Sequence, residues 1–392
     1  MKQSKTSKSS HEPRTGTKAG AKARTGSKAG TKLRTKKKPA RPTHDAADPI
    51  IVADVRVEPG ERKRIDVPVA RSYGRESVLP VVVVRGKLPG PRLFVSAAIH
   101  GDEINGVEII RRLLSMPVMK RLRGALLAVP VVNVYGFAAQ SRYLPDRRDL
   151  NRAFPGSSKG SIGARLAHAF MQEVVSESDY GIDLHTGSNH RTNLPQIRAC
   201  LDQKETEGLA LAFGAPVVLN SNLRDGSLRQ AVTELKIPML LYEAGESLRF
   251  DEVAIRAGVR GILAIMRKIG MLPRSAKEPT ALKPQIARSS AWVRAGAGGT
   301  LRNHVGLGDR VARGDQLGFV ADPLAGGEVA VVAPAAGILI GRTNLPLVNE
   351  GDALYHLALF GRPRKAAARI ETFNAELNPD LEPSPSGEPP II

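Results

Sequence analysis

Apolar residues between residues 49 and 273 form two kinds of pattern. Short continuous runs are typical of buried β-strands, and they comprise Val78–Val84, Leu93–Ile99, Ala125–Val132, Asp179–Leu184, Pro216–Leu219 and Pro238–Tyr242. Apolar residues at helical spacing follow residue 103 and recur over Ile162–Val174 and Val253–Ile269. This alternation predicts an α/β domain at residues 49–273, with a mostly parallel sheet that helices cover on both faces.

The pattern changes after a polar stretch at residues 274–285, which we interpret as a linker. Residues 286–361 contain short β-type runs separated by glycines, and this texture predicts a small β domain. The texture resembles the barrel-sandwich fold of biotinyl and lipoyl carrier domains, in which a lysine lies in a central turn. The corresponding region, residues 322–328, contains no lysine, so we expect a structural or gating role. Residues 362–392 are expected to be a loose tail.

Positive charge is concentrated near the N-terminus. Residues 1–44 contain 14 Lys and Arg and one acidic residue, whereas the rest of the chain has a net charge of only +7. With almost nothing apolar to bury, residues 1–48 are expected to form a disordered basic tail. Such a tail could contact nucleic acid or another polyanion, could be merely solvated, or could serve as a transit peptide.

The composition also indicates the cellular compartment in which the protein is expected. The single cysteine, Cys200, excludes an intrachain disulfide framework and fits a reducing environment. We find neither the apolar core of a signal peptide nor a run long enough to span a membrane. These features predict a cytoplasmic protein without membrane contact, and an oligomer is compatible with them.

Residues with metal-binding chemistry stand at the ends of predicted strands. His100-Gly-Asp-Glu103 follows the run that ends at Ile99, and Asp183-Leu-His185 closes another run. The carboxyl ends of parallel strands meet at one edge of a sheet. Two imidazoles and one carboxylate, from His100, Glu103 and His185, could therefore hold a metal ion with a position open for water. Asp183 could hydrogen-bond to an imidazole and fix its tautomer.

Two further features fit such a site. Glu243 directly follows the run Pro238–Tyr242, and beside a metal-bound water it would be a general base. Residues 141–156 contain four arginines and an asparagine. Because guanidinium groups match carboxylates in bidentate geometry, this segment predicts a loop that binds a substrate carboxylate.

The motifs His100-Gly-Asp-Glu103, Asp149-Leu-Asn-Arg152 and Asp183-Leu-His185, followed by Glu243, together resemble the succinylglutamate desuccinylase/aspartoacylase family of the zinc carboxypeptidase superfamily. The resemblance covers roughly residues 50–360, including the β-rich C-terminal part. It implies a zinc-carboxypeptidase-like fold and one Zn²⁺ per chain, held by His100, Glu103 and His185. It also implies that Glu243 is the catalytic base.

The same resemblance assigns the substrate contacts. Asn151 and Arg152 match the residues that bind the α-carboxylate of the substrate. Arg142 and Arg148 are both candidates for the arginine that polarises the scissile carbonyl. Arg198 is a candidate for reading a carboxylate on the acyl group.

The leading hypothesis is therefore a zinc-dependent deacylase that hydrolyses the amide bond of a small N-acyl amino acid, with a metal-bound water activated by Glu243. A carboxypeptidase-like enzyme that trims a peptide or a polyglutamyl tail is the alternative. A non-haem iron oxygenase would use His100, Asp102 and a distant histidine, but the helical pattern after Glu103 disfavours it. A nucleic-acid-binding protein would explain the basic tail, although the globular part lacks a known nucleic-acid-binding motif.

Overall fold

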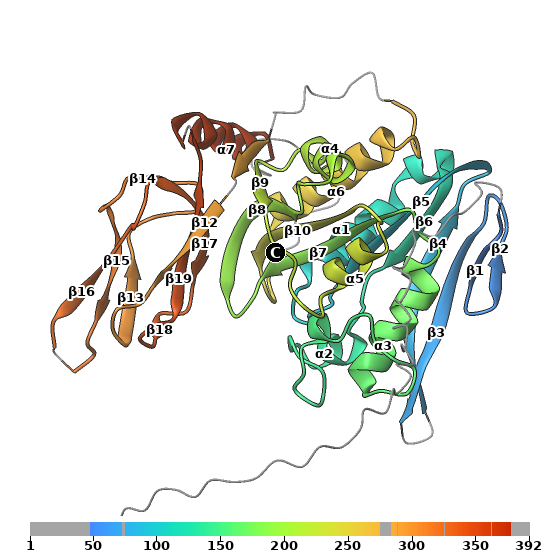
Figure 1. Cartoon of the computed structure of the whole chain (residues 1–392), viewed down its shortest axis with the longest axis horizontal. Coiled ribbons are helices and arrows are strands. Elements are labelled where there is room, and N and C mark those ends of the chain that lie inside the picture. The colour runs from blue at the N-terminus through green and yellow to red at the C-terminus, as the bar shows by residue number, and fades with distance from the viewer. Residues whose placement is uncertain are drawn as a thin grey trace, which may run out of the picture. The chain divides into compact units, whose positions relative to one another are not determined.

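A computed structural model describes residues 48–72, 75–274, 284–287, 289–324, 326–361 and 363–377. The predicted basic tail, apart from its last residue, lies outside the described residues, as does most of the predicted linker. Figure 1 shows the described elements and labels most of the helices and strands.

The centre of the protein is a 13-stranded mixed sheet. Its middle strands are parallel and lie in the order β10 (Met239–Glu246), β7 (Tyr180–Gly187), β5 (Leu88–Ala97) and β6 (Arg123–Val129). Antiparallel strands extend it beyond β6, namely β4 (Arg75–Arg85) and β3 (Arg62–Ser72). Beyond β10 it continues through β8 (Arg191–Ala199), β17 (Gly337–Thr343), β19 (Ala353–Leu359) and β12 (Ser289–Arg294).

Shorter strands complete this sheet at its margins. They are β9 (Val217–Asn220) beside β8, β11 (Gln285–Ala287) beside β9, and β14 (Arg310–Val311) beside β17. A separate hairpin is formed by β1 (Ile50–Val52) and β2 (Val55–Val57). The prediction of a mostly parallel sheet is thus correct for the middle strands and wrong for most of the strands on either side, although the short strands β9 and β11 also pair in parallel. A continuous apolar run reports burial on both faces of a strand, and it does not report strand direction.

Helices pack on both faces of the sheet. One face carries α1 (Asn105–Ser115), α4 (Lys204–Phe213) and α6 (Glu252–Lys268), and the other carries α3 (Ile162–Phe170) and α5 (Leu228–Glu234). A one-turn helix, α2 (Val134–Ala138), follows β6. Within the described ranges, no helix combines the length and the apolar character that crossing a bilayer requires.

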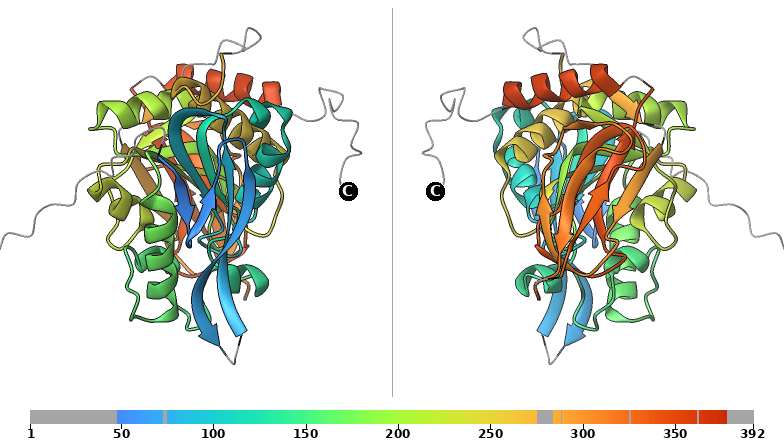
Figure 2. Two further views of the ribbon diagram at one scale, coloured as in Figure 1. Left: turned by 90° about the vertical axis from the view of Figure 1, so that its right-hand side faces the viewer. Right: turned by 90° about the vertical axis from the view of Figure 1, so that its left-hand side faces the viewer.

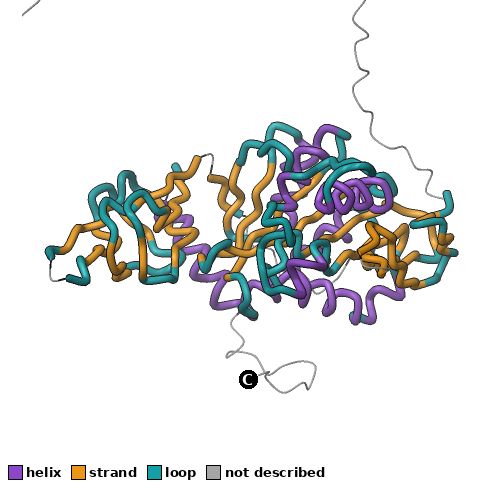
Figure 3. Tube along the Cα trace, turned by 90° about the horizontal axis from the view of Figure 1, so that it is seen from below, coloured by secondary structure: helices purple, strands orange, loops and turns teal. Residues whose placement is uncertain are grey.

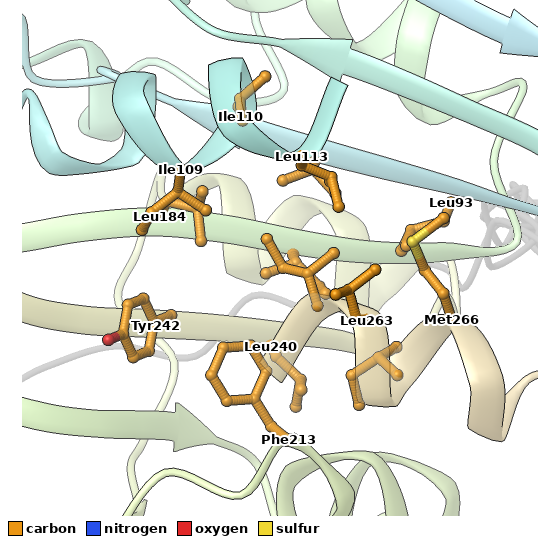
Figure 4. Close-up of a cluster of buried hydrophobic side chains, with 14 of the residues drawn as sticks. Leu93, Ile109, Ile110, Leu113, Leu184, Phe213, Leu240, Tyr242, Leu263 and Met266 are labelled. Atoms are coloured by element: carbon orange, nitrogen blue, oxygen red, sulfur yellow. The ribbon is translucent and has the colours of Figure 1, made fainter. Parts of the chain in front are cut away.

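Strand alternation explains why the sheet has two cores. Leu93 and Val95 of β5 belong to the core beneath α1, α4 and α6, whereas Phe94 belongs to the core beneath α3 and α5. Figure 4 shows the first core, where Ile109 of α1 lies near Leu184 of β7. Burying each such aliphatic side chain contributes about 1.5–3 kcal/mol to stability.

The predicted β-rich region consists of two packed sheets. A four-stranded sheet lies in the order β16 (Glu328–Val332), β15 (Gln316–Ala321), β13 (Gly299–Asn303) and β18 (Leu347–Val348). It packs against β12, β19 and β17, with Leu317, Val320, Leu339 and Leu354 buried in the core. Figure 3 shows this region as strands joined by loops. Because β17 also pairs with β8, the large sheet runs without a break from the α/β part into this region.

Part of the predicted loose tail is a helix. Residues 363–377 form α7 (Pro363–Leu377), which lies against α6 (Figure 2). Ile370 and Phe373 are buried at helical spacing, and the Arg260 guanidinium lies 5.0 Å from the centre of the Phe373 ring. The prolines and acidic residues further along dominate the composition of residues 362–392 and conceal this apolar spacing.

Candidate metal and catalytic site

Three neighbouring parallel strands bring the candidate residues to one edge of the sheet. His100 follows the end of β5 by three residues, and His185 and Glu243 lie opposite each other near the ends of β7 and β10. Leu184 and Tyr242 point into the core beneath α1 and α6. Because side chains alternate along a strand, His185 and Glu243 both face the opposite side.

The turn between β5 and α1 has a demanding backbone geometry. Ala98 adopts a left-handed conformation with φ of +49°, which is rare for a residue other than glycine. A Cβ atom at Gly101 would lie 2.0 Å from the carbonyl carbon of Gly136 in α2, so position 101 has no room for a side chain. This tight turn allows His100 and Glu103 to reach the same point.

His100, Glu103 and His185 form a buried cluster. Nδ1 of His100 lies 2.8 Å from Oε1 of Glu103, and Nδ1 of His185 lies 2.7 Å from Oε2 of Glu103. One potential ligand atom from each residue lies within 4.8 Å of the other two, and each residue is at most 5% exposed. The sequence therefore identified three residues that the fold does bring together. Asp102 is not part of the cluster, so the donor set proposed for an iron oxygenase does not form.

The outer nitrogen of each histidine faces another carboxylate. Nε2 of His185 lies 2.7 Å from Asp183, whose other oxygen accepts a hydrogen bond from the Ser96 hydroxyl at 2.8 Å. Nε2 of His100 lies 3.1 Å from Asp149. Ionised carboxylates only accept hydrogen bonds, so each Nε2 carries a proton. Each Nδ1 then faces a Glu103 oxygen, at 2.8 Å for His100 and at 2.7 Å for His185.

The charges of this cluster depend on each other. Burial alone would raise the pKa of Glu103, but the imidazoles of His100 and His185 hold that pKa well below its usual range. Burial would likewise lower the pKa of His185, but Asp183 and Glu103 hold it well above its usual range. The environment thus favours an ionised carboxylate with positive charge beside it, which a divalent metal could supply in place of protons.

Glu243 is contacted on one of its two oxygens. Oε2 accepts a hydrogen bond from Nδ2 of Asn193 at 2.6 Å and lies 2.9 Å from Nη2 of Arg198. Across the described ranges, no hydrogen bond or ion pair reaches Oε1. Arg198, predicted to read an acyl carboxylate, therefore contacts Glu243.

The two candidate arginines of the 141–156 loop lie in different environments. Arg142 donates to Glu103 at 3.0 Å and to Asp149 at 3.1 Å, so it joins the cluster. Arg148 is mostly exposed, lies 3.6 Å from Asp146 and does not line the cavity described next. Of these two arginines, Arg142 is in reach of the cluster.

A cavity of about 290 Å³ lies over the cluster and Glu243. Its walls include the predicted Asn151 and Arg152, and the Asn151 side chain also accepts a hydrogen bond from the backbone of Leu228 at 3.0 Å. Several other wall residues could not be predicted from motifs in the sequence, among them Arg191, Asn193, Arg224, Arg229, Trp292 and Arg294. Arg224 and Arg229 lie in a polar segment that follows the predicted strand Pro216–Leu219, and a polar segment after a strand end could have marked them as candidates.

Seven arginines and two glutamates line this cavity. Arg229 is 7% exposed, and its Nη1 has no hydrogen-bond partner in the described part of the chain. Burial and, after it, the positive charge of the neighbouring Arg198 together lower the pKa of Arg229 to about 10. The cavity is strongly electropositive and suits an anionic ligand.

The comparison with known protein families agrees with this geometry. Residues 89–269 match the succinylglutamate desuccinylase/aspartoacylase catalytic domain, and this span contains the buried cluster and Glu243. The chain belongs to this family. A relative, the N-alpha-acetyl-L-2,4-diaminobutyric acid deacetylase of Halomonas elongata, is 29% identical over 296 residues, which cover 72% of this chain and 85% of the relative.

Solved structures of the family share the fold. A succinylglutamate desuccinylase/aspartoacylase from Rhodobacter sphaeroides matches with a TM-score of 0.69 and 23% identity, over 77% of this chain and 95% of that chain. The product-bound ectoine utilization protein EutE (DoeB) from Ruegeria pomeroyi matches with a TM-score of 0.71 and 24% identity, over 80% and 98% respectively. These likenesses establish a common architecture.

Proposed function

We propose that this member of the family is a zinc-dependent deacylase that hydrolyses the amide bond of a small N-acyl amino acid. The observation that carries the proposal is the convergence of His100, Glu103 and His185 beside Glu243 in one arginine-lined cavity. The name of the Halomonas elongata relative, a deacetylase of an N-acetylated amino acid, supports the same reaction class.

The donor set fits a divalent metal. Two imidazole nitrogens and one carboxylate form the protein part of catalytic zinc sites that keep a position open for water. Nδ1 of His100 and Nδ1 of His185 both face Glu103, as ligand atoms around one ion would, while Asp149 holds Nε2 of His100. Bound there, zinc would supply Lewis-acid activation of the attacking water and of the amide carbonyl.

Proton transfer is assigned to Glu243. Its Oε1 accepts a proton from the attacking water, while Asn193 and Arg198 hold Oε2. The carboxyl group then passes this proton to the nitrogen of the breaking amide bond, so that a carboxylic acid and a free amino acid leave. Arg142, next to the cluster, stabilises the negative charge that develops on the carbonyl oxygen.

The remaining polar wall binds the rest of the substrate. Asn151 and Arg152 lie in the cavity wall and hold the α-carboxylate of the amino acid. The other arginines of the cavity wall add a positive electrostatic potential that attracts an anionic substrate.

The experiment is a substrate screen with the purified full-length protein loaded with zinc. The panel contains N-acetyl, N-succinyl and other N-acyl amino acids together with short unblocked peptides. The proposal expects release of free amine from at least one N-acyl amino acid, loss of this activity on chelation and its return on adding zinc. Activity confined to unblocked peptides would instead support carboxypeptidase-like trimming, and inactivity on the whole panel would contradict both functions.

A further inference from the structure

The contact between Asn193 and Glu243 is short and buried. Asn193 is 5% exposed and lies on β8, directly between β10 and β17. Its Nδ2 donates to Oε2 of Glu243 at 2.6 Å. A hydrogen bond to an ionised carboxylate is among the stronger kinds in proteins, so this contact restricts how the Glu243 side chain can rotate.

Chemistry dictates which way the Asn193 amide is turned. An ionised carboxylate can only accept hydrogen bonds, so the NH₂ group of the amide must face Glu243. The amide oxygen, Oδ1, therefore points to the opposite side, toward β17. A group on β17 that pushed on Oδ1 would change the contact with Glu243.

That side of the amide is occupied by a glycine. Gly341 lies opposite Asn193 in the antiparallel pairing of β17 with β8. A Cβ atom at position 341 would lie 2.8 Å from Oδ1 of Asn193, closer than a normal contact, whereas the next atom, Cβ of His356, would be 3.3 Å away. The absence of a side chain at 341 thus leaves the space that Oδ1 occupies.

We propose that Asn193 is a positioning residue for Glu243, and that β17 of the C-terminal region sets the orientation of its amide through Gly341. The inference rests on the proposed function, in which Glu243 is the general base. By holding Oε2 together with Arg198, Asn193 leaves Oε1 free to meet the attacking water. The C-terminal β region then contributes to catalysis without touching the reacting atoms.

The test is a double-mutant cycle with Gly341→Ala and Asn193→Ala in the full-length, zinc-loaded protein. Each single change should lower kcat by about 10-fold or more, because small misplacements of a catalytic group are costly, while KM changes less than about threefold. The double variant should match Asn193→Ala within about twofold, since the atom that the new methyl group displaces is gone. If the kcat of the double variant instead fell by the product of the two single losses, the proposal would be overturned.

Gly327→Ala is the matched control, because a Cβ at that position meets no atom within 4 Å, and it should retain wild-type kcat. A crystal structure of Gly341→Ala gives a second readout that does not depend on activity. The distance from Asn193 to Oε2 of Glu243 should lengthen beyond about 3.5 Å. An unchanged distance would overturn the proposal. If the wild-type protein hydrolysed no N-acyl amino acid, the proposed function would fail, while this distance would still decide whether Gly341 seats Asn193.

Discussion

The histidines of the cluster are each flanked by two carboxylates. His185 lies between Glu103 and Asp183, and His100 lies between Glu103 and Asp149. The outer carboxylates hold the Nε2 protons, and this leaves both Nδ1 atoms directed at Glu103. These contacts fix the tautomer and the ring orientation of both histidines, which is what ligands of a metal ion require.

Asp183→Asn should weaken zinc binding. The substitution keeps the shape of the side chain but removes the charge that makes His185 a stronger ligand, so zinc affinity should fall about 10-fold. Competition with a chromophoric chelator measures the affinity. The exposed Asp202→Asn is the control and should bind zinc as tightly as the wild type. Equal affinities in the two variants would contradict this role for Asp183.

The site residues could be predicted in part because motif and strand end coincide. His100, Glu103 and His185 stand where apolar runs stop, and parallel strands bring such positions together. Asp149 and Asn193 were not assigned a role, since their contacts with His100 and Glu243 arise only when distant segments meet. No local pattern in the sequence reports contacts of this kind.

Two elements of the C-terminal region could not be predicted from apolar runs. The helix α7 was hidden by the composition of its neighbours, and β12 brings Trp292 and Arg294 into the cavity wall although no motif marks them. For both elements, the surfaces against which they pack determine what they contribute to the protein.

Phe373→Ala should destabilise the protein by about 3–5 kcal/mol, because Phe373 is 1% exposed and its removal leaves a cavity between α7 and the core that includes α6. Urea denaturation measures the free energy of unfolding. Thr372→Ala, at an exposed position of the same helix, should change this free energy by less than about 0.5 kcal/mol. Equally small effects would show that α7 does not pack as described.

A buried histidine of β19, the strand that pairs with β12, predicts that the stability of the protein falls in acid. The Trp292 and His356 rings stack at 4.3 Å, and burial, together with the charges of Arg198 and Arg224, lowers the pKa of His356 to about 3. Below pH 6.5 the unfolded chain binds a proton at this histidine that the folded protein does not bind, so stability falls as the pH falls from about 6.5 toward 3.

Between pH 7 and pH 5, this histidine should therefore cost the wild type about 2 kcal/mol of stability. The His356→Gln variant should lose correspondingly less over the same interval, as measured by chemical denaturation at each pH. Parallel pH profiles for the two proteins would contradict the buried, neutral state of His356.

Because the sheet is continuous, both the α/β part and the C-terminal β region contribute residues to the cavity walls. β17 pairs with β8, which places β12 near the carboxyl ends of β7 and β10. On the scale of the whole molecule, this arrangement surrounds the cluster with positive charge. Both wall glutamates are already contacted by cationic groups, Glu103 by Arg142 and Glu243 by Arg198.

A cationic substrate side chain therefore meets no uncompensated carboxylate on the described walls. N-acyl amino acids with a carboxylate side chain should have a kcat/KM about 10-fold or more above those with an ammonium side chain. The difference should shrink as salt rises, because screening weakens the field. A preference for an N-acetyl-2,4-diaminobutyrate, the compound in the name of the Halomonas elongata relative, would contradict this charge selection.

The proposed hydrolysis needs a metal site and a separate carboxylate base, and the Glu243→Gln variant separates the contributions of the two. Zinc content and turnover are measured on the same preparation of the variant and of the wild type. The variant should keep one zinc per chain, since Glu243 is outside the cluster, and lose turnover by about 100-fold or more. Wild-type turnover in Glu243→Gln, with zinc bound, would show that Glu243 is not the catalytic base.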